Sequence, residues 1–233
     1  MPDAYMYLFL DAFTILGPLI LSFDKKVAFY KDWKYLFPAL AIISFAYLLW
    51  DVWFTKWGIW EFNYQYLLGP SLLKLPVEEF GFFLVVPYAC VFIYRCLQAY
   101  FPNLKLPTQA LYFGTLLLSL ALTISFWGKL YTTVTFGLIS ISMIAVRFTS
   151  LWKNLIAYFN HLWLAWVISM IPMFYVNGKL TGLPVLIYNN AENMFIRIGT
   201  IPFEDFFYNF LYIFWVVIIF ETLRSRASRL TTK

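Results

Sequence analysis

The sequence predicts an all-α, polytopic integral membrane protein, with seven transmembrane helices built as 3+1+3 from two parallel repeats. Three observations support this fold class. Hydrophobic residues make up 62% of the 233-residue chain and charged residues only 12%, with a mean hydropathy of +0.73, so lipid must cover much of the surface. Seven apolar runs are long enough to cross a bilayer. Three of these runs align with three later ones across an intervening run.

The predicted spans are set by runs of about 20 mostly apolar residues, the length that a bilayer-crossing helix requires. In chain order they are Tyr5–Phe23, Tyr35–Phe54, Phe80–Leu97, Thr108–Trp127, Leu130–Thr149, Leu155–Val176 and Phe206–Leu223. The two longest connections, Thr55–Val77 and Asn177–Phe203, are too apolar for free loops and too interrupted by Gly and Pro for whole spans. They are predicted to be re-entrant or interfacial segments.

The Lys and Arg residues predict the orientation. Alternate connections hold twelve of the 17 basic residues, and the opposite set holds five. Because basic connections are retained in the cytoplasm, the prediction is a multi-pass protein of the cell membrane with an outside N-terminus and a cytoplasmic C-terminus. The +5 net charge is explained by this flanking pattern, so no nucleic-acid partner is expected.

The repeat is carried by an offset of 126 residues, which places Asn63 on Asn189, Pro76 on Pro202 and Glu78 on Glu204. We therefore expect a first repeat over residues 1–105, a linking helix in 106–129 and a second repeat over 130–233. One linking helix makes the repeats parallel, so both acidic motifs reach the same, outer face. A single chain carries both copies, and a monomer would suffice; the oligomeric state stays open.

Adjacent carboxylates begin the third and seventh spans, at Glu78-Glu79 and Glu204-Asp205. Helix capping is the structural alternative and contributes about 0.3–1 kcal/mol per residue, less than the roughly 2.5–3.5 kcal/mol cost of a charge at mid-bilayer. An acid in apolar surroundings can instead hold a proton for general acid catalysis. We expect the identical pair, Glu78 and Glu204, to donate protons into a shared cavity, with Glu79 and Asp205 tuning or relaying them.

Several motifs resemble the integral-membrane lycopene cyclases of bacteria, archaea and fungi, the type assembled from two homologous domains. They are Trp57-Gly58-Ile59-Trp60, Leu75-Pro76-Val77-Glu78-Glu79 with Phe82-Phe83, Leu180-Thr181-Gly182-Leu183-Pro184 with Tyr188-Asn189, and Ile196-Arg197-Ile198 leading into Ile201-Pro202-Phe203-Glu204-Asp205-Phe206-Phe207. The resemblance covers nearly the whole chain, and both halves match in order. Asp205 stands where the first motif has Glu.

This resemblance implies a lipid-soluble linear carotenoid as substrate and a non-redox ring closure of its ψ-ends, as in the conversion of lycopene to β-carotene by way of γ-carotene. The sequence leaves open the ring type (β, ε or γ), whether one or both ends close, and the chain length of the carotenoid. No cofactor is expected, and no two of the ten glycines are spaced as Gly-x-Gly, so the dinucleotide fingerprint is absent. A carbocation requires dry, π-rich surroundings. The expected substrate-binding residues are Trp57, Trp60, Asn63, Tyr64, Phe80, Phe83, Tyr188, Asn189, Arg197, Phe206 and Phe207.

Two further contacts with the acids are expected. Asp51, at the outer end of the second span, aligns with Asn177 and is a candidate neighbour of the first acid pair. Asn63 and Asn189 are candidates for hydrogen bonds to the acids, and Arg197 for neutralising Glu204 or Asp205.

Three other classes compete with this prediction. A prenyltransferase would need aspartate-rich motifs for magnesium, and none occurs. A retinal photoreceptor needs a lysine within the last span, which Phe206–Leu223 lacks. A proton-coupled transporter of a small apolar or amphipathic solute stays open as the alternative, because intramembrane carboxylates also serve proton relays. No metal site is expected, since Cys90 and Cys96 face different sides of one helix.

Overall fold

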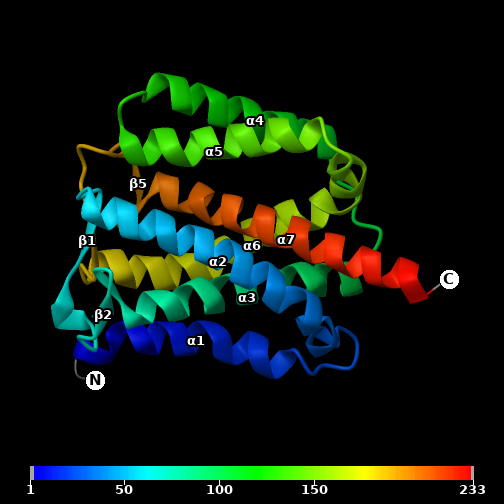
Figure 1. The fold of residues 1–233 in the computed structure, drawn as a ribbon, viewed down its shortest axis with the longest axis horizontal. Helices are drawn as coiled ribbons and strands as arrows, with labels where there is room; N and C mark the ends of the chain where they lie inside the picture. The colour runs from blue at the N-terminus through cyan, green and yellow to red at the C-terminus, as the bar shows by residue number, and fades with distance from the viewer. Residues whose placement is uncertain (1–2, 232–233) are drawn as a thin grey trace.

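The computed structural model describes residues 3–231, and within them seven helices have the length and hydropathy of membrane spans. Their axes are roughly aligned, and the helices pack side by side as a bundle (Figure 1). Their bounds are α1 Met6–Leu21, α2 Trp33–Lys56, α3 Val77–Tyr100, α4 Thr108–Ser125, α5 Leu130–Arg147, α6 Leu151–Gly182 and α7 Phe203–Thr231. The predicted all-α, seven-span membrane fold is confirmed.

The seventh helix runs beyond its predicted end at Leu223 to Thr231, and the difference that bears on the site lies at the end of α6. Its predicted end was Val176, whereas the helix continues to Gly182. The polar stretch that suggested a loop keeps its helical hydrogen bonding, and the Thr181 hydroxyl donates to the Asn177 carbonyl at 2.7 Å. As a result Asn177 is a helical residue with its side chain directed at α7, and the connection that follows is shorter than predicted.

The two long connections form small antiparallel strand pairs. Strand β1 (Trp60–Phe62) pairs with β4 (Leu186–Tyr188), with Glu61 opposite Ile187 at the centre. Each connection ends in a hairpin, β2 (Ser71–Leu72) with β3 (Leu75–Pro76), and β5 (Arg197–Ile198) with β6 (Ile201–Pro202). The strand labels gather at the left end of Figure 1, near the N-terminus. These pairs satisfy backbone groups that lipid could not.

The two hairpins sit at equivalent positions, since Arg197 and Pro202 pair in β5–β6 as Ser71 and Pro76 pair in β2–β3. Each hairpin leads directly into the helix that begins with an acid pair, α3 or α7. In both helices the carboxylates occupy the first turn, where the helix dipole favours negative charge. The hairpins therefore fix the direction in which the two acid pairs enter the bundle.

Helix α7 is central and α1 and α4 are peripheral. The most apolar window of α7 is 61% buried, against 17% for α1 and for α4. Helix α1 packs on α3, α4 on α5, α2 on α7 and α3 on α6. Figure 1 shows the α4–α5 pair at one side of the stack, α1 and α3 at the other, and α2, α6 and α7 between them. Phe210, Phe214 and Phe220 of α7 are fully buried in the core.

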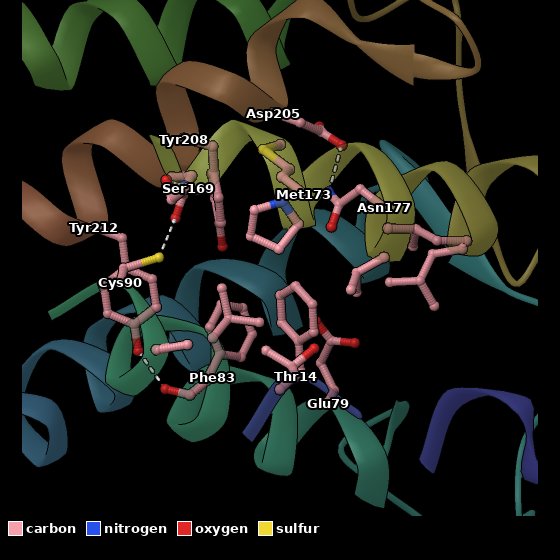
Figure 2. Close-up of a pocket in the computed structure, with 18 of the residues that line it drawn as sticks. Thr14, Glu79, Phe83, Cys90, Ser169, Met173, Asn177, Asp205, Tyr208 and Tyr212 are labelled. Carbon is pink, nitrogen blue, oxygen red and sulfur yellow. Dashed lines mark hydrogen bonds between the residues drawn. The ribbon is translucent and has the colours of Figure 1, made fainter. Parts of the chain in front are cut away.

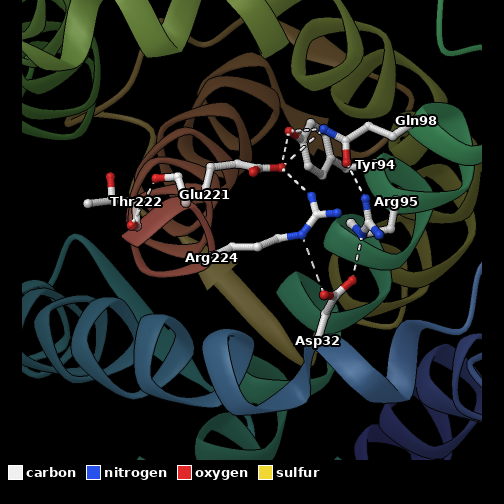
Figure 3. Close-up of polar contacts among 8 residues, drawn as sticks. Asp32, Tyr94, Arg95, Gln98, Glu221, Thr222 and Arg224 are labelled. Carbon is white, nitrogen blue, oxygen red and sulfur yellow. Dashed lines mark hydrogen bonds and ion pairs between the residues drawn. The ribbon is translucent and has the colours of Figure 1, made fainter. Parts of the chain in front are cut away.

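An ion-pair cluster (Figure 3) joins the ends of α3 and α7 that are opposite to the acid motifs. Asp32 of the short 3₁₀ helix η2 (Phe29–Asp32) accepts from Arg95 of α3 at 2.9 Å and lies 3.5 Å from Arg224 of α7. Arg224 also contacts Glu221 at 3.4 Å, and Glu221 accepts from the Tyr94 hydroxyl at 2.7 Å. This cluster links α2, α3 and α7 where the C-terminal helix leaves the core.

Candidate active site

A cavity of about 430 Å³ lies among α1, α3, α6 and α7, and residues of the β1–β4 strand pair also line it. Its lining is predominantly apolar, and three carboxyl groups reach it, those of Asp51, Glu79 and Asp205. Figure 2 shows Glu79 arriving from α3 and Asp205 from α7, on opposite sides of the cavity. All three carboxyl-bearing residues are at most 5% exposed. Three acids in an apolar enclosure are costly to retain, which points to a chemical role.

Glu79 sits in the half of the site formed by α1, α2 and α3. The Tyr7 hydroxyl of α1 donates to one Glu79 oxygen. The Asp51 carboxyl of α2 is a close electrostatic neighbour of Glu79, and Asp51 Oδ1 accepts from Trp60 Nε1 at 2.6 Å. Two neighbouring carboxyls and two aromatic donors therefore form one connected group.

Asp205 sits in the opposite half and accepts three hydrogen bonds. The Tyr131 hydroxyl donates at 2.6 Å, the Tyr188 hydroxyl at 2.8 Å and the Asn177 amide at 3.3 Å. Burial raises the pKa of Tyr188 well above its usual range, and the charge of Asp205 raises it further. Tyr188 therefore keeps its proton and remains a donor to Asp205 across the physiological range.

Glu78 and Glu204, the expected proton donors, do not line the cavity. Glu78 Oε1 accepts from the Leu68 amide at 2.7 Å, and Glu204 Oε1 accepts from the Met194 amide, also at 2.7 Å. Each of the two residues therefore binds the backbone of the connection that precedes its own helix. Adjacent helical residues point about 100° apart, so one member of each pair faces the cavity and the other faces the connection. The structure puts the second member in the cavity, contrary to expectation.

The site is built twice, with a small change of register. The Leu68–Glu78 and Met194–Glu204 bonds keep the offset of 126 residues. The tyrosines that bind the cavity acids, Tyr7 and Tyr131, are instead related by 124. The ungapped alignment hides this equivalence, which explains why neither tyrosine was a candidate. The signal in the sequence was a tyrosine at the start of the first helix of each repeat, spaced by 124 residues instead of 126.

The expected aromatic residues divide into those in the cavity and those outside it. Trp60, Phe83 and Tyr188 line it. Trp57 and Tyr64 are 59% and 48% exposed, and Phe80 is half-buried. Phe206 and Phe207 are buried but pack elsewhere, Phe206 against Phe174 and Phe207 against Phe136 and Trp166. Tyr208, which was not among the candidates, lines the cavity.

The expected polar contacts are only partly present. Asp51 is where the sequence placed it, beside the first acid pair. Asn63 caps a short helix through the Gln65 amide at 3.1 Å, and Asn189 donates to the Gly58 carbonyl at 3.1 Å, so neither contacts an acid. Arg197 binds the Thr200 carbonyl and the Asn190 side chain. Its guanidinium lies 5.8 Å from the centre of the Tyr188 ring. Arg197 therefore contacts Tyr188, which binds Asp205, and not Asp205 itself.

The cavity reaches the outer surface of the bundle between α1 and α6. Phe13, Leu16, Gly17 and Pro18 of α1 belong to its wall, and Phe13 and Leu16 are 51% and 60% exposed on the face that lipid would cover. The Phe13 and Tyr175 rings meet across this gap, 5.1 Å apart. Among residues 3–231, no group of three or more His, Cys, Asp and Glu side chains is arranged to hold a metal ion.

These features define a multi-pass membrane protein with an acid-lined cavity whose wall includes exposed apolar residues of α1. The family model described as lycopene cyclase matches the chain in two regions, residues 4–97 and 128–223. The chain therefore belongs to the lycopene cyclase family, and it is an enzyme that acts on carotenoids. No curated protein and no solved structure matches it.

Proposed function

We propose that this protein is a lycopene cyclase that closes the ψ-ends of lycopene by proton-initiated, non-redox cyclisation, forming β-carotene through γ-carotene. The observation that carries the proposal is the meeting of Asp51, Glu79 and Asp205 in one apolar cavity. Such a cavity offers an acid, a base and a dry enclosure at the same place. The reaction consumes no electrons and leaves the substrate formula unchanged, so it requires no redox cofactor.

The chemistry needs three things from the cavity. A carboxylic acid must protonate the terminal C1=C2 bond at C2, which leaves a tertiary cation at C1. The C5=C6 bond then attacks C1 and moves the charge to C5, and loss of the C6 proton to a carboxylate gives the β-ring. Water would trap either cation as an alcohol, so the apolar lining protects both. Trp60, Tyr131 and Tyr208 present aromatic rings there, and aromatic faces attract cations by about 0.5–2 kcal/mol each.

Access from the membrane fits the same substrate. A linear carotenoid dissolves in lipid, and the gap between α1 and α6 gives it a lateral route past Phe13 and Leu16. A cavity of about 430 Å³ is of ordinary ligand size, within a typical range of about 300–1,000 Å³. It would take one end of the polyene while the remaining chain extends into the bilayer.

We also propose the arrangement of the chain in the membrane. Repeats over 1–105 and 130–233, joined by 106–129, are supported by the matching hairpins and by the strand pair centred on Glu61 and Ile187. The Lys and Arg distribution supports an outer N-terminus and a cytoplasmic C-terminus in the cell membrane. Reporter fusions at each terminus test this orientation.

Expression in a lycopene-accumulating host tests the function. The expected result is conversion of the linear pigment to β-carotene, with γ-carotene as an intermediate, measured by chromatography and absorption spectra. Well-expressed protein that leaves lycopene unchanged would refute the proposal. If such protein instead moved protons together with an apolar solute across proteoliposomes, the transporter alternative would replace it.

A further inference from the structure

The two cavity acids differ in what surrounds them, although they occupy equivalent positions in the repeat. Asp205 accepts from three neutral donors, Tyr131, Tyr188 and Asn177. Glu79 has one tyrosine donor and a second carboxyl, Asp51, beside it. Two aligned positions contribute to this difference: Asp51 in the first half stands opposite Asn177 in the second, and Phe62 stands opposite Tyr188.

The pairing of Asp51 with Glu79 determines where a proton is held. An ionised carboxylate can only accept hydrogen bonds, and two adjacent ionised carboxylates repel one another, so such pairs share a proton. Trp60 Nε1, which can only donate, binds Asp51 Oδ1 at 2.6 Å and favours the ionised form of Asp51. Asp51 Oδ2 has no hydrogen-bond partner among the described residues, and its polar neighbours are the Thr55 hydroxyl and the Glu79 carboxyl. It is thus free to accept from a protonated Glu79.

Asp205 has the opposite surroundings. Both of its oxygens accept from protein donors, Oδ1 from Tyr131 and Oδ2 from Tyr188 and Asn177. Hydrogen bonds to a charged group are stronger than those to a neutral one. No other carboxyl is among its hydrogen-bond partners. Asp205 is therefore arranged as an anion facing the cavity, in position to attract positive charge and to accept a proton.

We propose that the two halves divide the acid–base work, with the Asp51–Glu79 pair supplying the proton through Glu79 and Asp205 acting as the anion and base. This inference rests on the proposed function and assigns roles within the same site. The Glu79 O–H bond breaks as the C2–H bond forms, and the C6–H bond breaks as Asp205 gains its proton. The site resets when Asp205 releases its proton to solvent and the Asp51–Glu79 pair takes one from solvent, so a turnover consumes no net proton. Asp51 acts as a positioning residue, because it holds the shared proton on Glu79.

Turnover in heavy water separates the two roles. Purified enzyme is incubated with lycopene in D₂O, and mass spectrometry measures deuterium in the product and in the recovered linear carotenoid. The wild type should place one deuterium per ring formed. Asp205→Asn should still protonate C2 but lose the base, so ring formation falls at least tenfold while deuterium accumulates in recovered lycopene. Glu79→Gln should show neither ring formation nor deuterium.

Asp51→Asn gives a second, independent measurement. An amide at this position can donate to Glu79 and favours its ionised form, so deuterium in substrate and product should fall together. Asp51→Glu should restore both, which a purely structural role would not predict. Size-exclusion profiles in detergent confirm that each variant is folded before it is compared.

The outcomes distinguish the inference from the function on which it rests. If the wild type neither cyclises nor labels lycopene, the proposed function fails. If the wild type cyclises but Glu79→Gln labels recovered lycopene, or Asp205→Asn fails to label it, the division of roles is overturned. Equal labelling in Asp51→Asn and the wild type would remove Asp51 from the donor pair.

Discussion

The contrast between Glu78 and Glu79 offers the most direct test of the site, because the two acids are neighbours in sequence and differ in what they face. Glu79 lines the cavity, whereas Glu78 binds the Leu68 amide at 2.7 Å. Gln is nearly isosteric with Glu and keeps an oxygen that can accept from that amide. It lacks a proton that can be transferred to carbon. The two substitutions therefore remove the same group, a carboxyl, at adjacent positions and differ in the chemistry lost.

The expected magnitudes differ widely. A hydrogen bond to a charged acceptor contributes about 1.5–3 kcal/mol, and one to a neutral acceptor about 0.5–1.5 kcal/mol. Glu78→Gln makes the acceptor of the Leu68 amide neutral, so it should cost roughly 1 kcal/mol of stability. Its turnover should stay within a few-fold of the wild type. Loss of a general acid costs about 10²–10⁴-fold in rate, equivalent to roughly 3–5 kcal/mol in the barrier. Glu79→Gln should show that loss.

The assay is the initial rate of ring formation in membranes, normalised to the amount of folded enzyme, with thermal stability in detergent measured in parallel. Glu204→Gln and Asp205→Asn form the equivalent pair in the other half, where Glu204 accepts from Met194 and Thr132. A Glu78→Gln enzyme that is folded and as inactive as Glu79→Gln would refute our identification of the cavity acids.

Three further predictions follow from individual contacts. Trp60→Phe removes the 2.6 Å hydrogen bond to Asp51. Because a hydrogen bond to a charged group contributes about 1.5–3 kcal/mol, this change should slow ring formation roughly tenfold. Trp57→Phe, at a 59% exposed position, is the control and should leave the rate unchanged. Arg95→Met breaks the 2.9 Å ion pair with Asp32 and should lower the stability by about 1 kcal/mol without changing the rate per folded molecule. The same change at exposed Arg226 should leave both the stability and the rate unchanged. Because one cavity holds all three acids, each binding event should close one ring, so a time course should show a monocyclic carotenoid that rises and then falls; a bicyclic product without that lag would contradict this.

Much of the architecture was predictable because it depends on properties that are local in the chain. A run of about 20 apolar residues must cross the membrane as a helix whatever surrounds it, and seven such runs became seven helices. The acid pairs were equally readable, since carboxylates at the lip of an apolar run are rare and costly. Their arrival at one end of the bundle is what the proposed parallel repeats predict. Family membership was visible in the motifs around those acids.

The composition of the cavity depended on tertiary packing. Whether Glu78 or Glu79 faces inward depends on the rotation of α3 about its axis, and one residue changes that direction by about 100°. The β2–β3 hairpin and the Leu68 amide fix this rotation, and nothing within the helix sequence specifies it. For the same reason Phe206 and Phe207 were expected in the cavity, whereas Tyr208 lines it.

The sequence by itself determined the seven spans, the repeated acid pairs and the kind of chemistry that acids in lipid can perform. Only the tertiary structure decided that Asp51, Glu79 and Asp205 share one cavity and that Tyr7 and Tyr131 bind two of them. The physical reason is the range of the interactions involved. Hydrophobic transfer acts on each segment separately, whereas a hydrogen bond between Tyr7 and Glu79 joins residues 72 positions apart and forms only once the helices have packed.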